Sequence, residues 1–430
     1  MSREMRHSGI EWIGEIPKEW KVARIKTIFK ERTELSETGT EKLLSVSEYY
    51  GVDSRASRID EGEYLSRSES LVGYKKCYER DFVSNIMLAW KGSFGVTKID
   101  GIVSPAYCVY QPFDSIYSFY YHYLFRTSLY TTRFKLFSRG IIDSRLRLYS
   151  PYFYDIEAII PPLSEQQKIA DYLDKVCGEV DEMIALQEQM IEELKAYKQS
   201  VITEAVTKGL NPDVPMKDSG IDWIGEVPEH WDICRLKFLC KYIKDGTHFS
   251  PTTVSEGYPY ITATDVRGVG IDYKSAKKIT HETFLDLQKA GCQPHKGDVL
   301  LVKDGATTGR VGMMIDNEEC VLLSSVAMLS PNNNISSSFL MYFIMSDFMQ
   351  FQIQLAMAGT ALPRITLSKL VNFLGVLCPL SEQQTIASYL DTKCAEIDAL
   401  IAIKQAKIEE LKDYKKSVIY EYVTGKKEVV

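Results

Sequence analysis

The chain carries two copies of one frame, and this duplication constrains its fold more than any other feature. Residues 7–17 read HSGIEWIGEIP and residues 218–228 read DSGIDWIGEVP, so eight of eleven positions are identical. Residues 163–174 and 380–391 share ten of twelve positions, including the segment LSEQQ. A third pair, LKAYKQSVIT and LKDYKKSVIY, keeps the same offset of 217 residues. This repeat is far longer than a solenoid unit and predicts two whole modules in tandem.

The segments between the repeated parts differ, which indicates two different targets. Residues 35–145 and 246–362 share almost no sequence. We expect a first domain, a long helix, a second domain and a second long helix. Their expected boundaries, in that order, are 1–162, 163–213, 214–379 and 380–430.

Composition is ordinary for a soluble protein, at 45% hydrophobic and 25% charged residues. The polar start MSREMRHSG lacks a signal-peptide core, and no apolar run approaches a membrane span, so we expect a cytoplasmic location. Nine scattered cysteines without a CxxC pair fit a reducing compartment. The net charge is −7, but residues 163–213 alone hold 5 basic and 11 acidic side chains. The overall charge therefore argues only weakly against nucleic-acid binding.

Each LSEQQ segment is expected to open a long helix. Ser164 and Gln167 have the spacing of a capping box, which the second segment repeats. Gly209 and Gly425 are expected to end the helices, giving each about 44 residues, or roughly 65 Å.

Apolar residues in these helices recur at alternating steps of four and three, a period typical of a coiled-coil seam. The predicted seams comprise Ile169, Leu173, Val176, Val180, Met183, Met190, Leu194, Tyr197 and Val201, and then Ile386, Leu390, Ile397, Leu400, Leu411, Tyr414 and Val418. We expect three lysines of the second helix to face three acids of the first, namely Lys393, Lys404 and Lys407 with Asp174, Glu188 and Glu192. Because domains and helices alternate along the chain, we expect the two helices to pair antiparallel; the alternative is two separate amphipathic surface helices.

The inserts have strand-like runs first and helix-like runs last. The strand-like runs are 43–47, 81–90 and 106–110, and then 258–266, 297–305 and 321–330; the helix-like runs are 115–134 and 335–353. This order predicts a mixed sheet closed by helices. The expected fold class is α+β (mixed): two domains of mixed α/β structure and two long antiparallel coiled-coil helices, in a pseudo-two-fold tandem repeat.

No catalytic or metal-binding motif stands out. Residues 305–312 read GATTGRVG and lack the lysine of a phosphate-binding P-loop, so we interpret them as a turn between strands. Cys292 and His295 have metal-like spacing but no second pair. The sequence thus favours a recognition scaffold over a catalyst.

The doubled set of motifs resembles the specificity (S) subunit of type I restriction-modification enzymes. The SGI-W-IGE-P openings, the PPLSEQQ and CPLSEQQ helix starts and the LK-YK-SVI helix ends carry this resemblance, which covers essentially the whole chain. Residues 43–52 and 85–95 resemble one class of target-recognition domain, and residues 244–251 and 302–310 resemble another.

The resemblance implies that each insert reads one half of a split double-stranded DNA target, while the helices set the distance between halves and dock two methyltransferase subunits. Those partners would methylate adenine with S-adenosylmethionine, and restriction/translocase subunits would use ATP and Mg. This chain would itself be non-catalytic, hold no cofactor and act in a bacterial or archaeal cytoplasm. Because the inserts differ, we expect an asymmetric target with half-sites roughly 10 bp apart.

Cations and hydroxyls on loops are the candidate DNA contacts, because phosphates and base edges require such groups. The densest basic stretch runs from Arg126 to Arg147, with Asp143 as its single acid; the alternative is a solvated helix face. Arg147 and Arg364 hold equivalent positions and are expected to clamp phosphates. The full set is Ser47, Tyr49, Lys91, Ser93, Arg133, Arg139, Arg145 and Arg147, with Lys244, Thr247, His248, Lys303, Thr307, Thr308, Arg310 and Arg364.

Trp12 and Trp223 hold equivalent positions in the repeated loops. Tryptophans often anchor interfaces, so both are candidate contacts for the methyltransferase subunits. The alternative is that they pack at the base of the long helices.

For the whole chain, the rival function is an interaction scaffold without DNA affinity, which predicts no salt-dependent DNA binding. The missing motifs disfavour a self-contained nuclease or methyltransferase.

Overall fold

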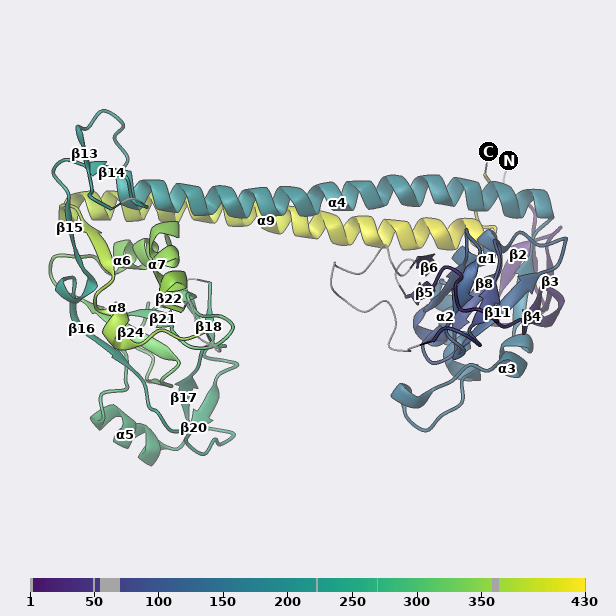
Figure 1. Cartoon of the computed structure of the whole chain (residues 1–430), viewed down its shortest axis with the longest axis horizontal. Coiled ribbons are helices and arrows are strands. Elements are labelled where there is room, and N and C mark those ends of the chain that lie inside the picture. Colours follow the sequence, from purple (N-terminus) through teal and green to yellow (C-terminus); the bar gives the residue numbers. More distant parts are fainter. Residues whose placement is uncertain are drawn as a thin grey trace. The chain divides into compact units, whose positions relative to one another are not determined.

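The computed structural model describes residues 3–48, 51–54, 70–221, 223–268, 270–357 and 363–429 (Figure 1). The chain divides into two compact units. Unit 1 combines residues 1–187 with 406–430, and unit 2 comprises residues 188–405. Among the described residues, no helix is both long and apolar enough to cross a membrane.

Unit 1 is built on a four-stranded antiparallel sheet in the order β4-β11-β8-β9. The strands are Phe29–Arg32 (β4), Phe82–Asn85 (β8), Phe94–Val96 (β9) and Tyr107–Pro112 (β11). Two further antiparallel pairs are Leu44–Ser47 with Gly51–Ser54 (β5, β6) and Lys75–Cys77 with Gly101–Val103 (β7, β10).

The core of unit 1 is rich in aromatic rings. Its helices are Ser118–Leu124 (α1), Ser128–Phe137 (α2) and Ser150–Tyr154 (α3), with short turns at Ala89–Lys91 (η3) and Asp143–Arg145 (η4). Phe82 of the sheet stacks on Phe153 of α3 at 5.9 Å, and Phe125, just after α1, meets Phe82 edge-on at 5.5 Å. Burying such large rings accounts for much of the stability of a domain of this size.

Unit 2 repeats the same sheet order, β16-β24-β21-β22, from an insert with unrelated sequence. Its strands are Cys240–Asp245 (β16), Val299–Val302 (β21), Val311–Met313 (β22) and Val326–Pro331 (β24). Its helices are His281–Lys289 (α5), Ser337–Met345 (α6), Asp347–Met357 (α7) and Leu367–Leu370 (α8). Unit 2 also has a three-stranded sheet of Tyr258–Ile261 (β17), Lys277–Ile279 (β20) and Val321–Leu322 (β23). A separate antiparallel pair is formed by Val266–Arg267 (β18) and Gly270–Ile271 (β19).

Both units share a frame of two small antiparallel pairs and a 3-10 turn. In unit 1 these are Met5–His7 with Glu15–Pro17 (β1, β2), Lys21–Arg24 with Glu157–Ile160 (β3, β12) and Ile25–Thr27 (η1). In unit 2 they are Met216–Asp218 with Glu226–Pro228 (β13, β14), Asp232–Arg235 with Leu374–Leu377 (β15, β25) and Leu236–Phe238 (η5). The mixed α+β class and the tandem repeat are thus confirmed.

The long helices are Leu163–Lys208 (α4) and Leu380–Val423 (α9), with 46 and 44 residues. Gly209 and Gly425 follow them with φ of 78° and 72°, a left-handed conformation that glycine adopts without strain. Within unit 1, Lys415 of α9 binds Asp181 of α4 at 2.6 Å. Within unit 2, Lys198 binds Asp398 at 2.7 Å. The expected helix ends and the antiparallel pairing are confirmed.

The predicted capping box at the start of each long helix is wrong. Because α4 begins at Leu163, Ser164 already lies within its first turn. The buried glutamine is Gln166, whose amide donates to a carbonyl of the preceding loop at 2.8 Å and accepts from the Tyr117 N–H at 2.8 Å. Gln383 makes the equivalent bonds in unit 2. The repeated glutamine therefore ties the start of each long helix to the neighbouring segments of its own unit.

The predicted seam is displaced by one residue along part of α4. Leu173 and Val180 are buried as expected, but the seam continues through Cys177 and Ile191. Met183, a predicted seam residue, is 52% exposed. At several of these positions two consecutive residues are apolar, so the 3.5-residue period alone does not show which of the two is buried.

The predicted lysine–acid pairs between the helices are wrong for Lys393 and Lys407. Lys393 and Lys407 each bind a glutamate three residues ahead on their own helix, at 3.1 Å. Such i,i+3 partners lie on one helix face and are reached without crossing to a neighbour.

Candidate nucleic-acid interface

The predicted contact Lys91 and Lys135, a lysine of the basic stretch 126–147, meet at one aromatic ring. Lys91, at the end of η3, and Lys135, on α2, lie 5.2 and 4.8 Å from the ring centre of Trp90. Lys135 also binds Asp143, on the loop between α2 and α3, at 2.8 Å. The structure therefore brings these exposed lysines together with the arginine-rich loop.

The loop between α2 and α3 is a braced turn. Arg139 and Arg147 exchange backbone hydrogen bonds of 2.8 and 2.9 Å across its base. Glycine is required at position 140, because a Cβ there would lie 2.5 Å from the Arg145 carbonyl oxygen. Arg139 and Arg145 are exposed, Arg147 is half-buried, and Ile141 at the apex is 100% exposed. We call Lys91, Lys135, Arg139, Arg145 and Arg147 the unit 1 basic cluster.

The prediction that Arg126 belongs to an exposed basic patch is wrong. Its guanidinium donates to the backbone carbonyls of Ser47, Glu48 and Phe94. Burial lowers its pKa to about 10, so it remains charged at neutral pH. Arg126 thus holds the end of β5, where the predicted contact Ser47 lies. The next predicted contact, Tyr49, lies outside the described residues.

Two other predicted contacts of unit 1 lie apart from the basic cluster or beneath the surface. Ser93 is buried, so its side chain does not reach solvent in this conformation. Arg133 lies over Trp12, with 5.1 Å between the guanidinium carbon and the ring centre. Trp12 also meets Tyr130 edge-on at 5.2 Å and is partly buried. Trp223, its counterpart in unit 2, is half exposed and contacts Phe351.

The predicted contacts of unit 2 gather around a buried lysine. Lys303, only 2% exposed, lies 3.4 Å from Asp245 and 2.9 Å from Asp304. It therefore orients two carboxylates and does not itself reach the surface, which corrects the expectation of an accessible lysine. The exposed Arg364 lies 3.4 Å from Asp304, and the exposed His248 lies 3.4 Å from Asp245. These five residues form the unit 2 ionic cluster.

The remaining candidates of unit 2 lie on β16 and on turns. Lys244 is exposed on β16, whereas Thr247 just after it is buried. Thr307, Thr308 and Arg310 lie on the turn from β21 to β22, as the GATTGRVG segment predicted. The Thr308 hydroxyl donates to a carbonyl of its own turn at 2.7 Å, and Arg310 donates to a β18 carbonyl at 3.2 Å.

Arg147 and Arg364 hold equivalent chain positions in different surroundings. Arg147 pairs with Arg139 across the loop base, whereas Arg364 bridges to Asp304. The two units thus present different charge patterns from the same place in a repeated fold. Within the described ranges, no three His, Cys, Asp or Glu side chains are grouped to hold a metal ion.

Comparison with known proteins supports the duplicated frame. The sequence profile described as the type I restriction modification DNA specificity domain matches residues 17–196 and again residues 228–413. The chain belongs to this family.

The specificity family includes relatives that align with part of the chain. The type I restriction enzyme MjaVIII specificity subunit of Methanocaldococcus jannaschii is 29% identical over 285 residues, which cover 64% of this chain and 63% of that protein. The EcoBI specificity subunit of Escherichia coli is 27% identical over 249 residues, 56% of this chain and 52% of that protein. The chain thus aligns with less than two thirds of either relative's length.

Solved structures share the fold. A chain from a study of complex assembly and conformational transition of the type I R-M system superposes with a TM-score of 0.71 at 17% identity, covering 95% of this chain and 98% of that one. The HsdS subunit from Thermoanaerobacter tengcongensis gives 0.52 at 18% identity, with the same two coverages.

One feature of the specificity-domain frame escaped the sequence reasoning. Trp20 and Trp231 are fully buried, and their indole N–H groups donate to Glu165 at 2.8 Å and Glu382 at 2.9 Å. Each bond joins the hairpin segment to the start of a long helix. Tryptophan and glutamate recur at these positions in both copies of the frame. This recurrence is the signal from which the bond could have been predicted.

Each unit also exposes three apolar side chains at matching helix positions, which we call its apolar trio. The trios are Met183, Leu186 and Tyr414 in unit 1 and Leu400, Ile403 and Tyr197 in unit 2. Their members correspond at the repeat offset of 217. Exposed apolar patches mark interaction sites, and repetition at matching positions is the pattern expected of a surface that contacts the same partner twice.

Proposed function

We propose that this chain is the DNA-specificity subunit of a type I restriction-modification system, each unit binding one half of a bipartite, asymmetric duplex target. The observation that carries this proposal is the repetition of one sheet and frame with two different polar clusters on their loops. A repeated scaffold accounts for two similar docking events, and different clusters account for two different half-sites.

The unit 1 basic cluster suits phosphate binding. Its cations lie on a loop and at helix ends, and Lys135 pairs with Asp143. The unit 2 ionic cluster combines donors with two carboxylates, Asp245 and Asp304, and carboxylates accept hydrogen bonds from base amino groups. Phosphate contacts set register, while base contacts supply sequence preference.

The two apolar trios support the docking of two copies of a methyltransferase subunit. Under this proposal, the partner supplies S-adenosylmethionine-dependent adenine methylation, and restriction/translocase subunits supply ATP- and Mg-dependent activity. This chain contributes recognition, and the partner subunits carry out the catalysis.

The first test removes single lysines of the basic cluster, in complex with the cognate methyltransferase subunit. Lys91→Ala and Lys135→Ala should each weaken binding to every duplex and reduce the slope of log affinity against log salt by about 1. Lys416→Ala is the matched control, because Lys416 is an exposed lysine that pairs with Asp413 on its own helix. Its affinity and slope should match the wild type.

The outcome separates the rival functions. If the unmodified complex shows no salt-dependent affinity for any duplex, the chain is an interaction scaffold and the DNA proposal fails. If Arg147→Ala and Arg364→Ala both leave affinity and slope unchanged, the two arginines do not share a phosphate-clamping role.

A further inference from the structure

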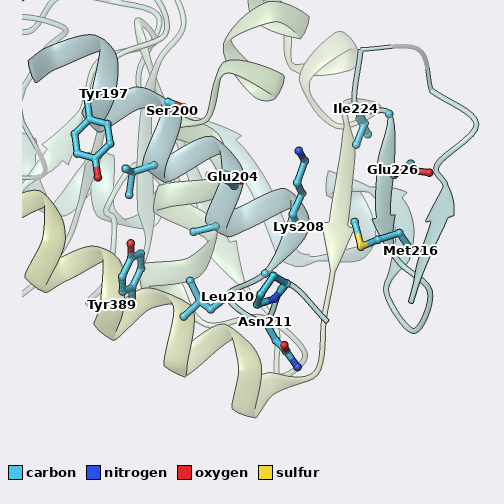
Figure 2. Close-up of a pocket in the computed structure, with 15 residues that line it drawn as sticks. Tyr197, Ser200, Glu204, Lys208, Leu210, Asn211, Met216, Ile224, Glu226 and Tyr389 are labelled. Carbon is cyan, nitrogen blue, oxygen red and sulfur yellow. The ribbon is translucent and has the colours of Figure 1, made fainter. Parts of the chain in front are cut away.

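A pocket in unit 2 opens where the end of α4 meets the start of α9 and the β13–β14 hairpin (Figure 2). Its volume is about 740 Å³. Tyr197 and Ala205 of α4, Tyr389 of α9 and Ile224 of the hairpin segment line it. Tyr197 is half exposed, so the pocket is accessible from solvent.

The matching position in unit 1 is filled by a ring of the chain itself. The repeat offset of 217 relates Ala205 to Tyr422 and Tyr389 to Tyr172. In unit 1 the Tyr422 and Tyr172 ring centres lie 4.5 Å apart. The hydrogen bond between these side chains raises the pKa of Tyr172. Alanine at position 205 provides no such ring beside Tyr389.

The lining of the pocket matches an aromatic side chain. Figure 2 shows Tyr197 and Tyr389 at one end, with their hydroxyl groups directed toward each other. Apolar surface comes from Ala205 and Ile224, and charged groups come from Glu204, Lys208 and Glu226. A ring with an apolar face and a polar edge is the type of group that anchors protein interfaces in such pockets.

We propose that this pocket receives a tyrosine or phenylalanine side chain of the methyltransferase subunit that docks on unit 2. The proposal rests on the docking proposed above. Tyr197 belongs both to the pocket and to the unit 2 apolar trio, so the pocket and the docking surface are continuous. The ring that unit 1 supplies from its own Tyr422 is, at unit 2, supplied by the partner.

The test fills the unit 2 pocket with a tyrosine ring, as Tyr422 fills the matching position in unit 1. Ala205→Tyr in the full chain should place a ring against Tyr389, as Tyr422 lies against Tyr172. Native mass spectrometry with the cognate methyltransferase subunit should show two bound copies for the wild type. Because unit 1 binds a copy although Tyr422 fills its site, Ala205→Tyr should weaken the tighter of the two binding steps at least tenfold, toward the affinity of the other step, in a titration followed by native mass spectrometry.

The control is Ala395→Tyr, which adds the same side chain at an exposed position of α9 outside the pocket. It should still bind two copies. Circular dichroism and thermal unfolding check that Ala205→Tyr is folded. If it is not, Tyr389→Ala removes one wall of the pocket and should weaken the same copy.

The two proposals fail in different ways. If folded Ala205→Tyr binds both copies with wild-type affinity, the pocket is not an anchor site, although docking stands. If the wild-type chain binds no methyltransferase subunit, the docking proposal fails and the pocket has no such occupant.

Discussion

At the scale of single residues, the partly buried Arg126 and His122 pack against the end of β5 and the start of β6. Arg126 donates to the carbonyls at the end of β5. His122 of α1 lies beneath Gly51, where a Cβ would approach its ring to 2.9 Å. Sequence reasoning assigned Arg126 to the surface because it stands in a basic run. Its burial depends on three carbonyls that only the tertiary fold brings together.

His122 makes stability depend on pH. Burial, with the nearby charge of Arg126 as a smaller cause, lowers its pKa from 6.5 to about 3. The unfolded chain therefore binds a proton that the folded chain excludes between these values. Stability is full above pH 6.5 and falls as the pH drops toward 3, by about 2 kcal/mol at pH 5. Urea unfolding followed by circular dichroism should show this loss.

The comparison that isolates this residue is His122→Gln, which should lose less stability than the wild type between pH 7.5 and pH 5. The exposed His281→Gln is the control and should follow the wild type. Identical pH profiles for His122→Gln and the wild type would show that this ring does not carry the effect.

At the scale of elements, the long helices carry two rows of apolar side chains, one buried stripe and one exposed stripe. Sequence reasoning predicted the extent, ends and antiparallel pairing of α4 and α9, because repeats, glycines and a 3.5-residue period indicate them directly. It did not separate the stripes: several predicted seam residues, including Met183 and Tyr414, lie on the exposed stripe. Which stripe is buried depends on what each unit places against the helix.

Two isoleucines of α9 give a matched test of the stripes. Ile408 is 6% exposed and Ile403 is 62% exposed. Ile408→Ala should cost about 2–4 kcal/mol, because it leaves a cavity in a packed seam. Ile403→Ala should change stability by less than about 0.5 kcal/mol but weaken methyltransferase docking. Thermal unfolding and a pull-down with that subunit measure both effects. Equal destabilisation by the two variants would contradict the assignment of the stripes.

At the scale of the whole molecule, the chain uses one architecture twice and places a different cluster of polar residues on each copy. Sequence reasoning predicted the duplication and the mixed α+β class, since repeats and alternating patterns are local signals. It did not predict that unrelated inserts form the same strand order, because strand pairing is a long-range property. It found many polar candidates on loops but not their grouping: Lys303 is buried between carboxylates, and Lys91 and Lys135 share Trp90.

The most direct test of the central claim is genome-wide mapping of methyladenine in a host that expresses this chain with its methyltransferase subunit. We predict one methylated motif made of two unlike half-sites separated by a fixed, unspecified spacer. A chimaera that replaces residues 246–362 with the insert of another specificity subunit should change one half-site only. A continuous or palindromic motif, or no new methylation from a stable complex, would contradict the account.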